Sequence, residues 1–330
     1  MKSTKRKALA FAFTIAGLVL LFLLAVNTGG LKVGFRELLE GLFVSYNENV
    51  ATIYDLRFPR IFIAMLGGAA LAVSGVLLQA VMKNPLTDPG IIGISSGASL
   101  TAVLMTAFFP SLYFITPMFA FFGGIAACII VYSLSWKEGL QPLRMILVGV
   151  AVNAVFTGLM SAFNSATGSE YAGVASIVNA NISLKTWDDV QMLVGYVAAG
   201  LILAILVSRL CNLLALEDRT ARSLGVDVTG ARVGVSLIAV MLASISTAVI
   251  GTISFLALIV PHIARILVGS DHKVLIPYSA VLGAFVLLLA DTVGRVVAAP
   301  YEISSSVILS CVGGPFFIFL LRRAQKTYGG

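Results

Sequence analysis

The stretch RIFIAMLGGAALAVSGVLLQ, residues 60–79, decides the fold of this 330-residue chain. It is apolar over enough residues for an α-helix to cross about 30 Å of hydrocarbon. Four small residues and one amide recur in it at helical spacing, which places them on one face: Ala64, Gly68, Ala72, Gly75 and Gln79. Small side chains let helices approach closely in a membrane, and a buried amide needs a partner or water. The pattern predicts a central helix, with or without a part in transport.

Composition extends this pattern to the whole chain. Hydrophobic residues make up 59% of it and charged residues only 11%, whereas soluble domains carry roughly 25% charged residues. We expect an all-α, polytopic membrane protein with ten spans, forming a single domain over residues 1–330 without a separate soluble catalytic domain. The predicted spans are 8–26, 60–80, 91–109, 117–135, 143–163, 190–208, 234–252, 255–269, 276–296 and 305–321.

The basic residues predict the topology. If the N-terminus is cytoplasmic, 16 of the 22 lysines and arginines fall in cytoplasmic segments, as the positive-inside bias requires. The other six are Lys32, Arg36, Arg57, Arg60, Lys185 and Arg295. Both termini are therefore expected in the cytoplasm. We expect residues 8–26 to be retained as a first span rather than removed as a secretory signal. This apolar run is longer than the apolar region of a signal peptide, which usually has about 7–15 residues.

Two connections are longer than turns. On the outside, residues 164–189 contain an apolar run too short to cross the bilayer, and we expect a short helix at about 171–180 lying across a pore mouth. On the inside, residues 209–232 mix apolar and charged side chains at helical spacing, which predicts short amphipathic helices at the cytoplasmic surface. We call residues 209–232 the coupling segment.

The sequence KNPLTDPGIIGISSGA, residues 83–98, places two prolines and three glycines around a return into the membrane. Such residues free backbone groups, which lipid penalises unless they face protein or a water-filled path. A tight cytoplasmic hairpin explains the prolines equally well, but it does not explain why Ser95, Ser96 and Ser99 continue into the span. We interpret the segment as lining a path.

Motifs that carry chemistry are scarce. Cys128, Cys211 and Cys311 are widely spaced, and His262 and His272 show no ligand-type spacing, so we predict no metal site and no cofactor. The chain lacks a Gly-Lys dipeptide and with it a P-loop, so we predict that this polypeptide hydrolyses no nucleotide and is not an enzyme. Its basic residues lie between apolar runs rather than on one face, so no nucleic-acid partner is expected.

Eight motifs follow one another along nearly the whole chain. They are RFPR at 57–60, GGAALAVSGVLLQ at 67–79, NPLTDP at 84–89, IGISSGA at 92–98, ARSLG at 221–225, GTISFLALIVPHIAR at 251–265, Asp291 with Arg295, and GGPFF at 313–317. In this order and spacing they resemble the FecCD-type permease subunits of ABC importers for ferric siderophores, haem and cobalamin. The chain departs from the family at Gly251-Thr252-Ile253, usually Gly-Pro-Ile, and at Asn179-Ala180-Asn181, often Gly-Ser.

The resemblance implies a type II ABC importer permease architecture in a bacterial plasma membrane. In such an importer, two ten-span permeases form a dimer that works with a cytoplasmic ATPase dimer and an extracytoplasmic substrate-binding protein. The second permease is either an identical or a related chain. We expect this chain to form half of the path for an iron-siderophore complex, driven by ATP that a separate subunit hydrolyses.

Two alternatives stay open. Haem or cobalamin importers share the same motifs, so either compound is an alternative cargo. A proton-coupled secondary carrier is the other alternative, with Asp291, Glu302 and His262 as its titrating residues. Asp291 and Arg295 lie one helical turn apart, which favours an internal ion pair over a proton relay.

Three sets of residues are candidate sites. The translocation set is Gln79, Asn84, Leu86 and Ser95, in which the resemblance suggests Asn84 and Leu86 as a cytoplasmic constriction. The ATPase-coupling set is Leu216, Glu217, Ala221, Arg222, Leu224 and Gly225. Its apolar members are expected to enter a groove of the ATPase while its charged members contact the rim.

The docking set is Arg57, Arg60 and Arg295, expected at one height on the outer face. Arginine holds a carboxylate bidentately, and the resemblance also suggests that these residues receive glutamates of the binding protein. Alternatively, Arg57 and Arg60 anchor their helix at the lipid headgroups and Arg295 neutralises Asp291.

Overall fold

The structure is a computed structural model that describes residues 4–28, 33–135, 142–167, 174–298 and 301–328. Every regular element in these ranges is helical, as expected for the all-α class. The elements are α1 (Thr4–Asn27), α2 (Phe35–Phe43), α3 (Glu48–Met82), α4 (Ile94–Phe108), the short 3-10 helix η1 (Pro110–Ile115), α5 (Thr116–Ser135), α6 (Pro142–Ala166), α7 (Val174–Val178), α8 (Trp187–Leu206), α9 (Ser208–Leu214), α10 (Asp218–Ser223), α11 (Val228–Ile250), α12 (Leu256–Val268), α13 (His272–Val297) and α14 (Ser305–Tyr328).

Within these ranges, seven helices are long and apolar enough to cross a membrane. They are α1, α3, η1 with α5, the 144–166 part of α6, α8, α11 and α13. Three shorter apolar helices, α4, α12 and the 305–320 part of α14, fall on the three remaining predicted spans. The count of ten spans stays a prediction.

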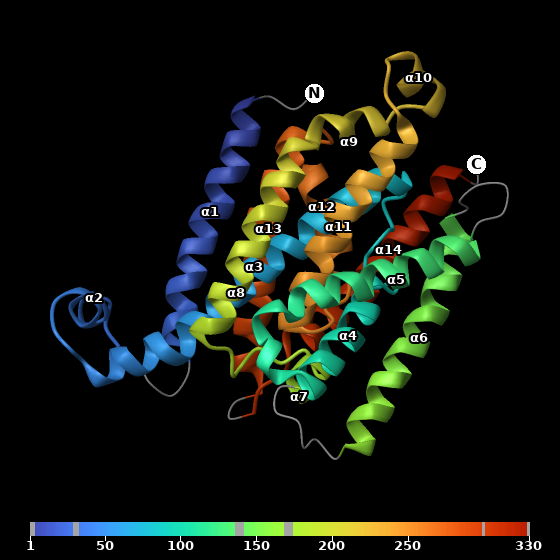
Figure 1. The fold of residues 1–330 in the computed structure, drawn as a ribbon. Coiled ribbons are helices and arrows are strands. Elements are labelled where there is room, and N and C mark those ends of the chain that lie inside the picture. The colour runs from blue at the N-terminus through green and yellow to red at the C-terminus, as the bar shows by residue number, and fades with distance from the viewer. Residues whose placement is uncertain (1–3, 29–32, 136–141, 168–173, 299–300, 329–330) are drawn as a thin grey trace.

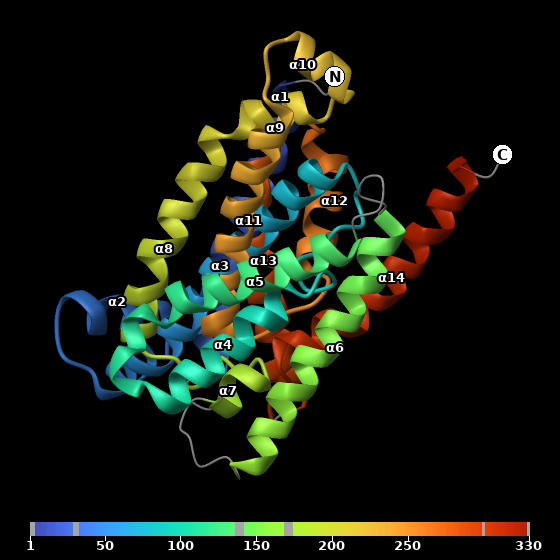
Figure 2. The same cartoon turned by 45° about the vertical axis from the view of Figure 1, so that its right-hand side comes forward.

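Helix α3 runs through the middle of the bundle, with α8, α11, α12 and α13 packed against it (Figure 1, Figure 2). A Cβ atom on Gly68 would lie 2.3 Å from the carbonyl oxygen of Gly283 in α13. A Cβ atom on Gly75 would lie 2.0 Å from the carbonyl oxygen of Ala257 in α12. The helix backbones are therefore in direct contact, which confirms the role predicted for the small-residue face.

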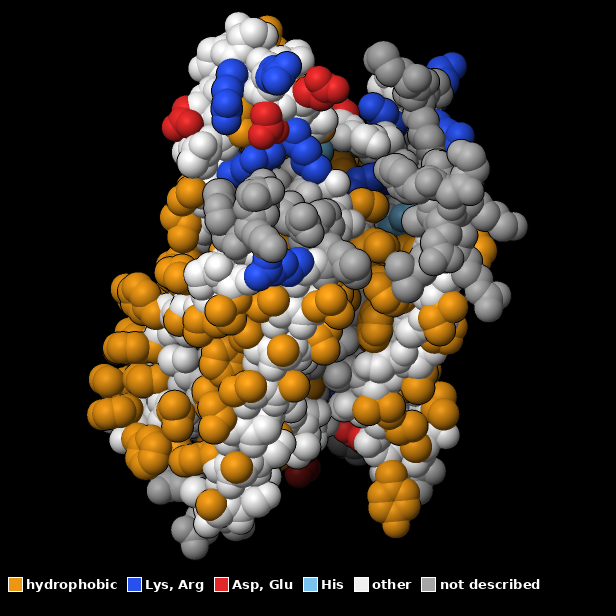
Figure 3. Space-filling view, turned by 90° about the vertical axis from the view of Figure 1, so that its right-hand side faces the viewer, with side chains coloured by type: hydrophobic (Ala, Val, Ile, Leu, Met, Phe, Trp, Pro, Cys, Tyr) orange, Lys and Arg blue, Asp and Glu red, His pale blue; other side chains and the backbone are white. Residues whose placement is uncertain are grey.

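The two ends of the bundle differ. The first turn of α1, both α9 and α10, and the last turn of α14 lie toward one end, whereas α7 lies at the opposite end (Figure 1). On the face shown in Figure 3, charged side chains gather at the first end, and apolar side chains cover most of the surface below them. We call these the α10 end and the α7 end.

Helix α3 begins at Glu48 rather than near residue 60. The side-chain oxygen of Asn47 accepts hydrogen bonds from the backbone N–H groups of the second and third helical residues, which caps the helix at this earlier position. Arg57 and Arg60 consequently lie inside the helix, with Pro59 between them, more than two turns after its first residue.

One other helix start and one entire helix differ from the sequence expectation. Helix α11 begins at Val228, capped by the Asp227 side chain, so the last residues of the coupling segment form its first turn. Helix α2 was not predicted, although its apolar residues follow the spacing of an amphipathic helix.

The described part of the outer short helix ends at Val178, about two residues before its expected end. Residues 171–173 of its expected range lie outside the described residues, and the described part is the five-residue α7. Val174 and Ile177 of α7 are buried. Ile177 lies so close to Gly251 that a Cβ atom there would be 2.5 Å from its carbonyl oxygen. This contact packs α7 against the end of α11.

Replacing Gly68 by alanine tests the contact between α3 and α13. The added methyl group must push the helices apart, and overpacking of this kind typically costs about 1–3 kcal/mol. We expect Gly68→Ala to lower the unfolding temperature in detergent. Gly195→Ala in α8 is the matched control, because nothing lies within 4 Å of a Cβ atom there. Equal unfolding temperatures for the two variants would contradict the contact.

Candidate functional site

The α3–α4 turn, residues 83–93, is held by its own side chains. Lys83 ends α3 with a left-handed φ of 50°. The Asn84 side-chain oxygen accepts from the N–H of Leu86 at 3.0 Å. One carboxylate oxygen of Asp88 accepts from the N–H of Gly90 at 2.7 Å. These bonds satisfy backbone groups that the helix break leaves without helical partners.

Gln79 ties this turn to α12. Its amide nitrogen donates to the carbonyl oxygens of Thr87 and Ala257, each at 3.3 Å, and its amide oxygen accepts from Arg265. The need for a partner, predicted from the sequence, is confirmed. Since both ends of the amide are engaged by protein, Gln79 braces the turn in this conformation.

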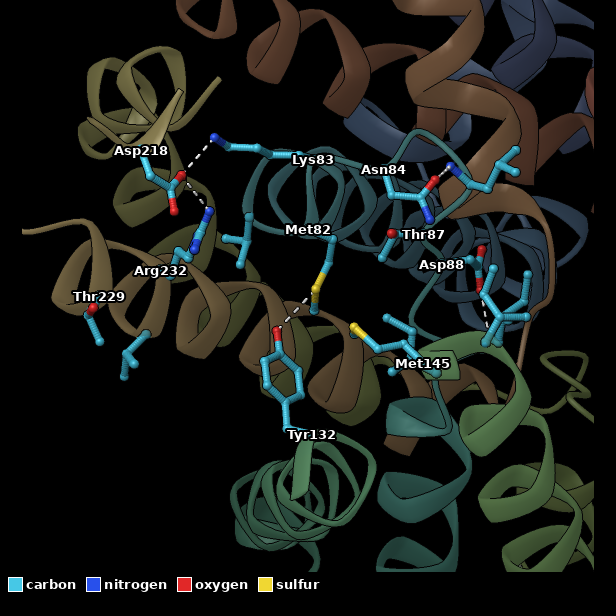
Figure 4. Close-up of a pocket in the computed structure, with 16 residues that line it drawn as sticks. Met82, Lys83, Asn84, Thr87, Asp88, Tyr132, Met145, Asp218, Thr229 and Arg232 are labelled. Atoms are coloured by element: carbon cyan, nitrogen blue, oxygen red, sulfur yellow. Dashed lines mark hydrogen bonds and ion pairs between the residues drawn. The ribbon is translucent and has the colours of Figure 1, made fainter. Parts of the chain in front are cut away.

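An ion-pair bridge joins the coupling segment to the same turn (Figure 4). Asp218, the first residue of α10, accepts from Lys83 Nζ at 2.8 Å and from Arg232 of α11 at 2.9 Å. Lys83 also donates to the carbonyl oxygen of Leu216. The hydrogen bond from Lys83, aided by the charge of Arg232, lowers the pKa of Asp218. A displacement of α10 would therefore act directly on the end of α3. We call this contact the Asp218 bridge.

A cavity of about 610 Å³ lies beside the Asp218 bridge (Figure 4). Its walls come from the end of α3, the α3–α4 turn, α5, α6, α10 and α11. Asn84 and Leu86 line it, whereas Gln79 and Ser95 do not. Ser95 is buried, and its hydroxyl has no hydrogen-bond partner among the residues that the structure describes. The structure thus places two of the four predicted translocation residues on this cavity, which we call the inner cavity because the expected topology puts it on the cytoplasmic side.

Asp88 is fully buried but only half satisfied. While one of its carboxylate oxygens caps the turn, the other, Oδ2, has no hydrogen-bond partner in the described ranges. Burial raises the pKa of Asp88 to about 6, against the opposing effect of the backbone N–H groups of Gly90 and Ile91. Burial therefore makes Asp88 a weaker acid than a free aspartate, although a pKa of about 6 still leaves it mainly ionised at neutral pH.

The coupling set divides into an inward and an outward part. Ala221 is 1% exposed and packs within its own chain, which corrects the expectation that it enters a groove of a partner. The other members are exposed: Leu216, Glu217, Arg222, Leu224 and Gly225. Leu224, at 61% exposure, is the most accessible apolar side chain of the set.

Toward the α7 end, Arg60 joins three segments. Its guanidinium group binds Asp291 of α13 through two nitrogens, with Nη2 at 2.8 Å from Oδ1, and Nη1 lies 2.9 Å from Glu302. Glu302 also accepts from the Ser183 hydroxyl at 2.5 Å. Burial opposes ionisation of Glu302, but the contacts with Ser183 and Arg60 prevail and lower its pKa. A second cavity, of about 290 Å³, adjoins this cluster.

The three arginines of the docking set converge here, but not as an open patch. Arg60 and Arg295 are 7% and 9% exposed. Arg295 Nε lies 3.3 Å from Asp291, as predicted, and its Nη1 donates to a backbone carbonyl near the end of α1. Arg57 donates to the neighbouring carbonyl at 2.6 Å. Asp291 is thus shared by Arg295 and Arg60. The sequence analysis predicted the pair with Arg295 but not the pair with Arg60.

Four charged residues of the inner site were not predicted as site residues: Lys83, Asp88, Asp218 and Arg232. Asp88 could have been predicted as a site residue from its position, because a carboxylate beside a proline and a re-entering helix is unusual so close to the membrane. Lys83, Asp218 and Arg232 carry no comparable signal, since each alone resembles an ordinary surface charge.

Comparison with known proteins gives one consistent result. Residues 17–323 match the FecCD transport family. The chain is 40% identical over 327 residues, 99% of both chains, to the "Probable heme-iron transport system permease protein IsdF" of Staphylococcus aureus strain MSSA476. Its fold matches an inward-facing "metal-chelate type ABC transporter" with TM-score 0.79 and 28% identity, over 96% of this chain and 99% of the other. PsaBC from Streptococcus pneumoniae, in complex with Fab, shares the fold at TM-score 0.59 and 16% identity, over 87% and 95% of the two chains.

Asp88→Asn should change how stability depends on pH. An aspartate in an unfolded chain has a pKa of about 4, so between about pH 4 and 6 the folded protein holds a proton on Asp88 that the unfolded chain has lost. The stabilisation from this proton is fully present below pH 4 and is lost as pH rises through 6. The variant keeps an oxygen for the turn but carries no charge at any pH.

We expect the stability advantage of Asp88→Asn over wild type to grow from pH 4 to 6 and to level off on the order of 3 kcal/mol. Unfolding curves in detergent across this range measure it. Asp55→Asn, at an exposed position of α3, is the control. If the difference in unfolding free energy between Asp88→Asn and the wild type does not vary with pH, Asp88 is not a buried, unpaired carboxylate.

Arg60→Gln should destabilise the protein strongly, because it leaves Asp291 and Glu302 without their main cation. Removing one member of a buried ion pair typically costs about 3–5 kcal/mol. Arg36→Gln is the control, since its pair with Glu40 is exposed and such pairs contribute at most about 1 kcal/mol. If both variants unfold at the wild-type temperature, the Arg60 cluster is not a stabilising element.

Proposed function

The chain belongs to the FecCD transport family, and from this premise we propose that it forms half of the path through which an ATP-driven importer brings an iron chelate into a bacterial cell. It is a multi-pass protein of the bacterial plasma membrane and a permease subunit of an ABC importer, not an enzyme. A separate subunit hydrolyses the ATP.

Haem is the cargo that similarity favours. The relative IsdF, which matches nearly the entire chain, is named for heme-iron transport. A ferric siderophore, the cargo expected from the sequence, belongs to the same broad class of iron held by an organic chelator. We therefore place haem ahead of a siderophore as the first cargo to test.

The observation that carries the proposal is the Asp218 bridge beside the inner cavity. An ATPase docked on the exposed Leu216 and Leu224 would displace α10, and Asp218 would transmit this displacement to Lys83. Lys83 begins the turn that places Asn84 and Leu86 on the cavity wall. The contacts thus connect the energy-supplying face to the proposed constriction through one side chain.

We propose ten spans with the α10 end in the cytoplasm. Both the start of α1 and the end of α14 lie toward this end, which is consistent with two cytoplasmic termini (Figure 1). Charged side chains gather there as the positive-inside bias predicts. The partners are a second permease, identical or related, a cytoplasmic ATPase dimer and an extracytoplasmic binding protein.

The binding protein would dock at the α7 end through Arg57, Arg60 and Arg295. Because Arg60 is already engaged, an incoming carboxylate would reach it by displacing Glu302, whose side chain is 41% exposed, rather than the buried Asp291. Docking at this position would therefore be an exchange of carboxylates.

Uptake into vesicles tests the proposed function. The permease, its ATPase and its binding protein are reconstituted, and the binding protein is supplied with haem or with a ferric hydroxamate. Haem uptake that requires ATP on the ATPase side supports the proposal. Uptake of the hydroxamate alone would assign a siderophore cargo, and uptake driven by a proton gradient without ATP would assign a proton-coupled carrier.

Asp218→Asn should uncouple ATP hydrolysis from transport. The variant weakens both pairs of the bridge, whose side chains are between 32% and 37% exposed, and partly exposed pairs of this kind contribute up to about 1 kcal/mol. We expect the cargo transported per ATP hydrolysed to fall about threefold, while ATPase activity persists. Lys83→Gln should have a similar effect, and the double variant should add little to Asp218→Asn, because both changes break the Lys83–Asp218 pair. Lys273→Gln, an exposed lysine near the same end, is the control. Additive losses in the double variant would contradict transmission through the bridge.

A further inference from the structure

The inner cavity has the dimensions and walls of a small-molecule site. Its volume of about 610 Å³ lies within the range of roughly 300–1,000 Å³ that is usual for such sites. Met82, Tyr132 and Met145 line it together with aliphatic side chains, and the Tyr132 hydroxyl donates to the Met82 sulfur at 3.2 Å. Methionine side chains adapt to bulky apolar bodies, because they are unbranched and polarisable.

One side of the cavity carries surplus positive charge. Lys83 and Arg232 both line the cavity and share the single carboxylate of Asp218. This side of the cavity is therefore suited to an additional anionic group.

The other side carries the opposite charge. Asp88 lies across the cavity from the Asp218 bridge (Figure 4), and its buried Oδ2 has no hydrogen-bond partner within the described part of the chain. An anionic group is repelled from Asp88 and attracted to Lys83 and Arg232. The cavity is therefore polarised, and it would orient a molecule that has an acidic edge and an apolar body.

We propose that this cavity binds the cargo on the inner side of the membrane as a carboxylate-bearing, largely apolar iron chelate. The carboxylates contact Lys83 and Arg232, and the apolar body lies against Met82, Tyr132 and Met145. This inference rests on the proposed iron-chelate function and narrows it to chelates with acidic groups at one edge. Haem has this form, with two carboxylates on one edge of an apolar ring.

Two variants with opposite expected effects test the proposal. The permease and its ATPase are assembled in lipid nanodiscs and titrated with haem and with haem dimethyl ester, whose carboxylates are blocked. Arg232→Gln should weaken haem binding about tenfold, because it removes a charged hydrogen-bond partner. Asp218→Asn should strengthen haem binding, because both cations lose the carboxylate that competes with the ligand. Neither variant should change the affinity for the ester.

The opposite signs separate binding from a merely structural effect. If both variants weaken haem binding, or if haem and its ester shift together, the proposed carboxylate contacts are wrong. Lys83→Gln gives a second test with the same expected sign as Arg232→Gln should the latter fail to assemble. Lys273→Gln, which does not line the cavity, should bind haem as the wild type does.

The outcomes also distinguish this site from the proposed function. If vesicles import haem but the haem affinity is the same in the wild type and in the charge variants, the site is refuted and the function stands. If vesicles do not import haem but its binding follows the cavity charges as described, the site stands and haem is excluded as the cargo.

Discussion

Direct contact between helix backbones along α3 is the interaction on which the rest of the structure depends. Helices in lipid gain little from burying apolar surface against one another, so they associate through close packing and polar contacts. Gly68 and Gly75 bring α13 and α12 against α3 without intervening side chains. This proximity allows Gln79 of α3 to reach a carbonyl group of α12 and Arg60 to reach Asp291 of α13. These polar contacts can therefore form only because the helix backbones are closely packed.

Helix α3 also relates the two polar clusters to each other. It is 35 residues long, about 50 Å at 1.5 Å per residue. Arg60 lies in its first half, toward the α7 end, and Lys83 caps its C-terminal end. One continuous helix therefore carries the Arg60 cluster and the start of the α3–α4 turn. Movement of α3 as a rigid body would change both clusters together, whereas a bend within it would separate them.

The sequence was sufficient for features that depend on local pattern. Apolar runs marked the long helices, and the spacing of small residues marked the packed face of α3, because both follow from helix length and periodicity. The early start of α3 was missed because its cap at Asn47 precedes a polar first turn. The pairs Arg60–Asp291 and Lys83–Asp218 join residues 231 and 135 positions apart. Such pairs depend on which helices become neighbours, and no single residue type indicates that. The need of Gln79 for a partner was evident, but the identity of Arg265 was not.

The contact between Gly68 and Gly283 has a consequence for how this protein diversifies. Each glycine lies so close to the other's carbonyl oxygen that neither position accepts even one methyl group while the other helix stays in place. A change at one position therefore requires a compensating shift of an entire helix, which would also move Asp291 relative to Arg60. Substitutions are therefore not tolerated at these two positions. The exposed apolar faces of α1 and α6, in contrast, tolerate exchange among aliphatic residues. Lineages are therefore expected to vary around α3 while its contact line with α13 is inherited unchanged.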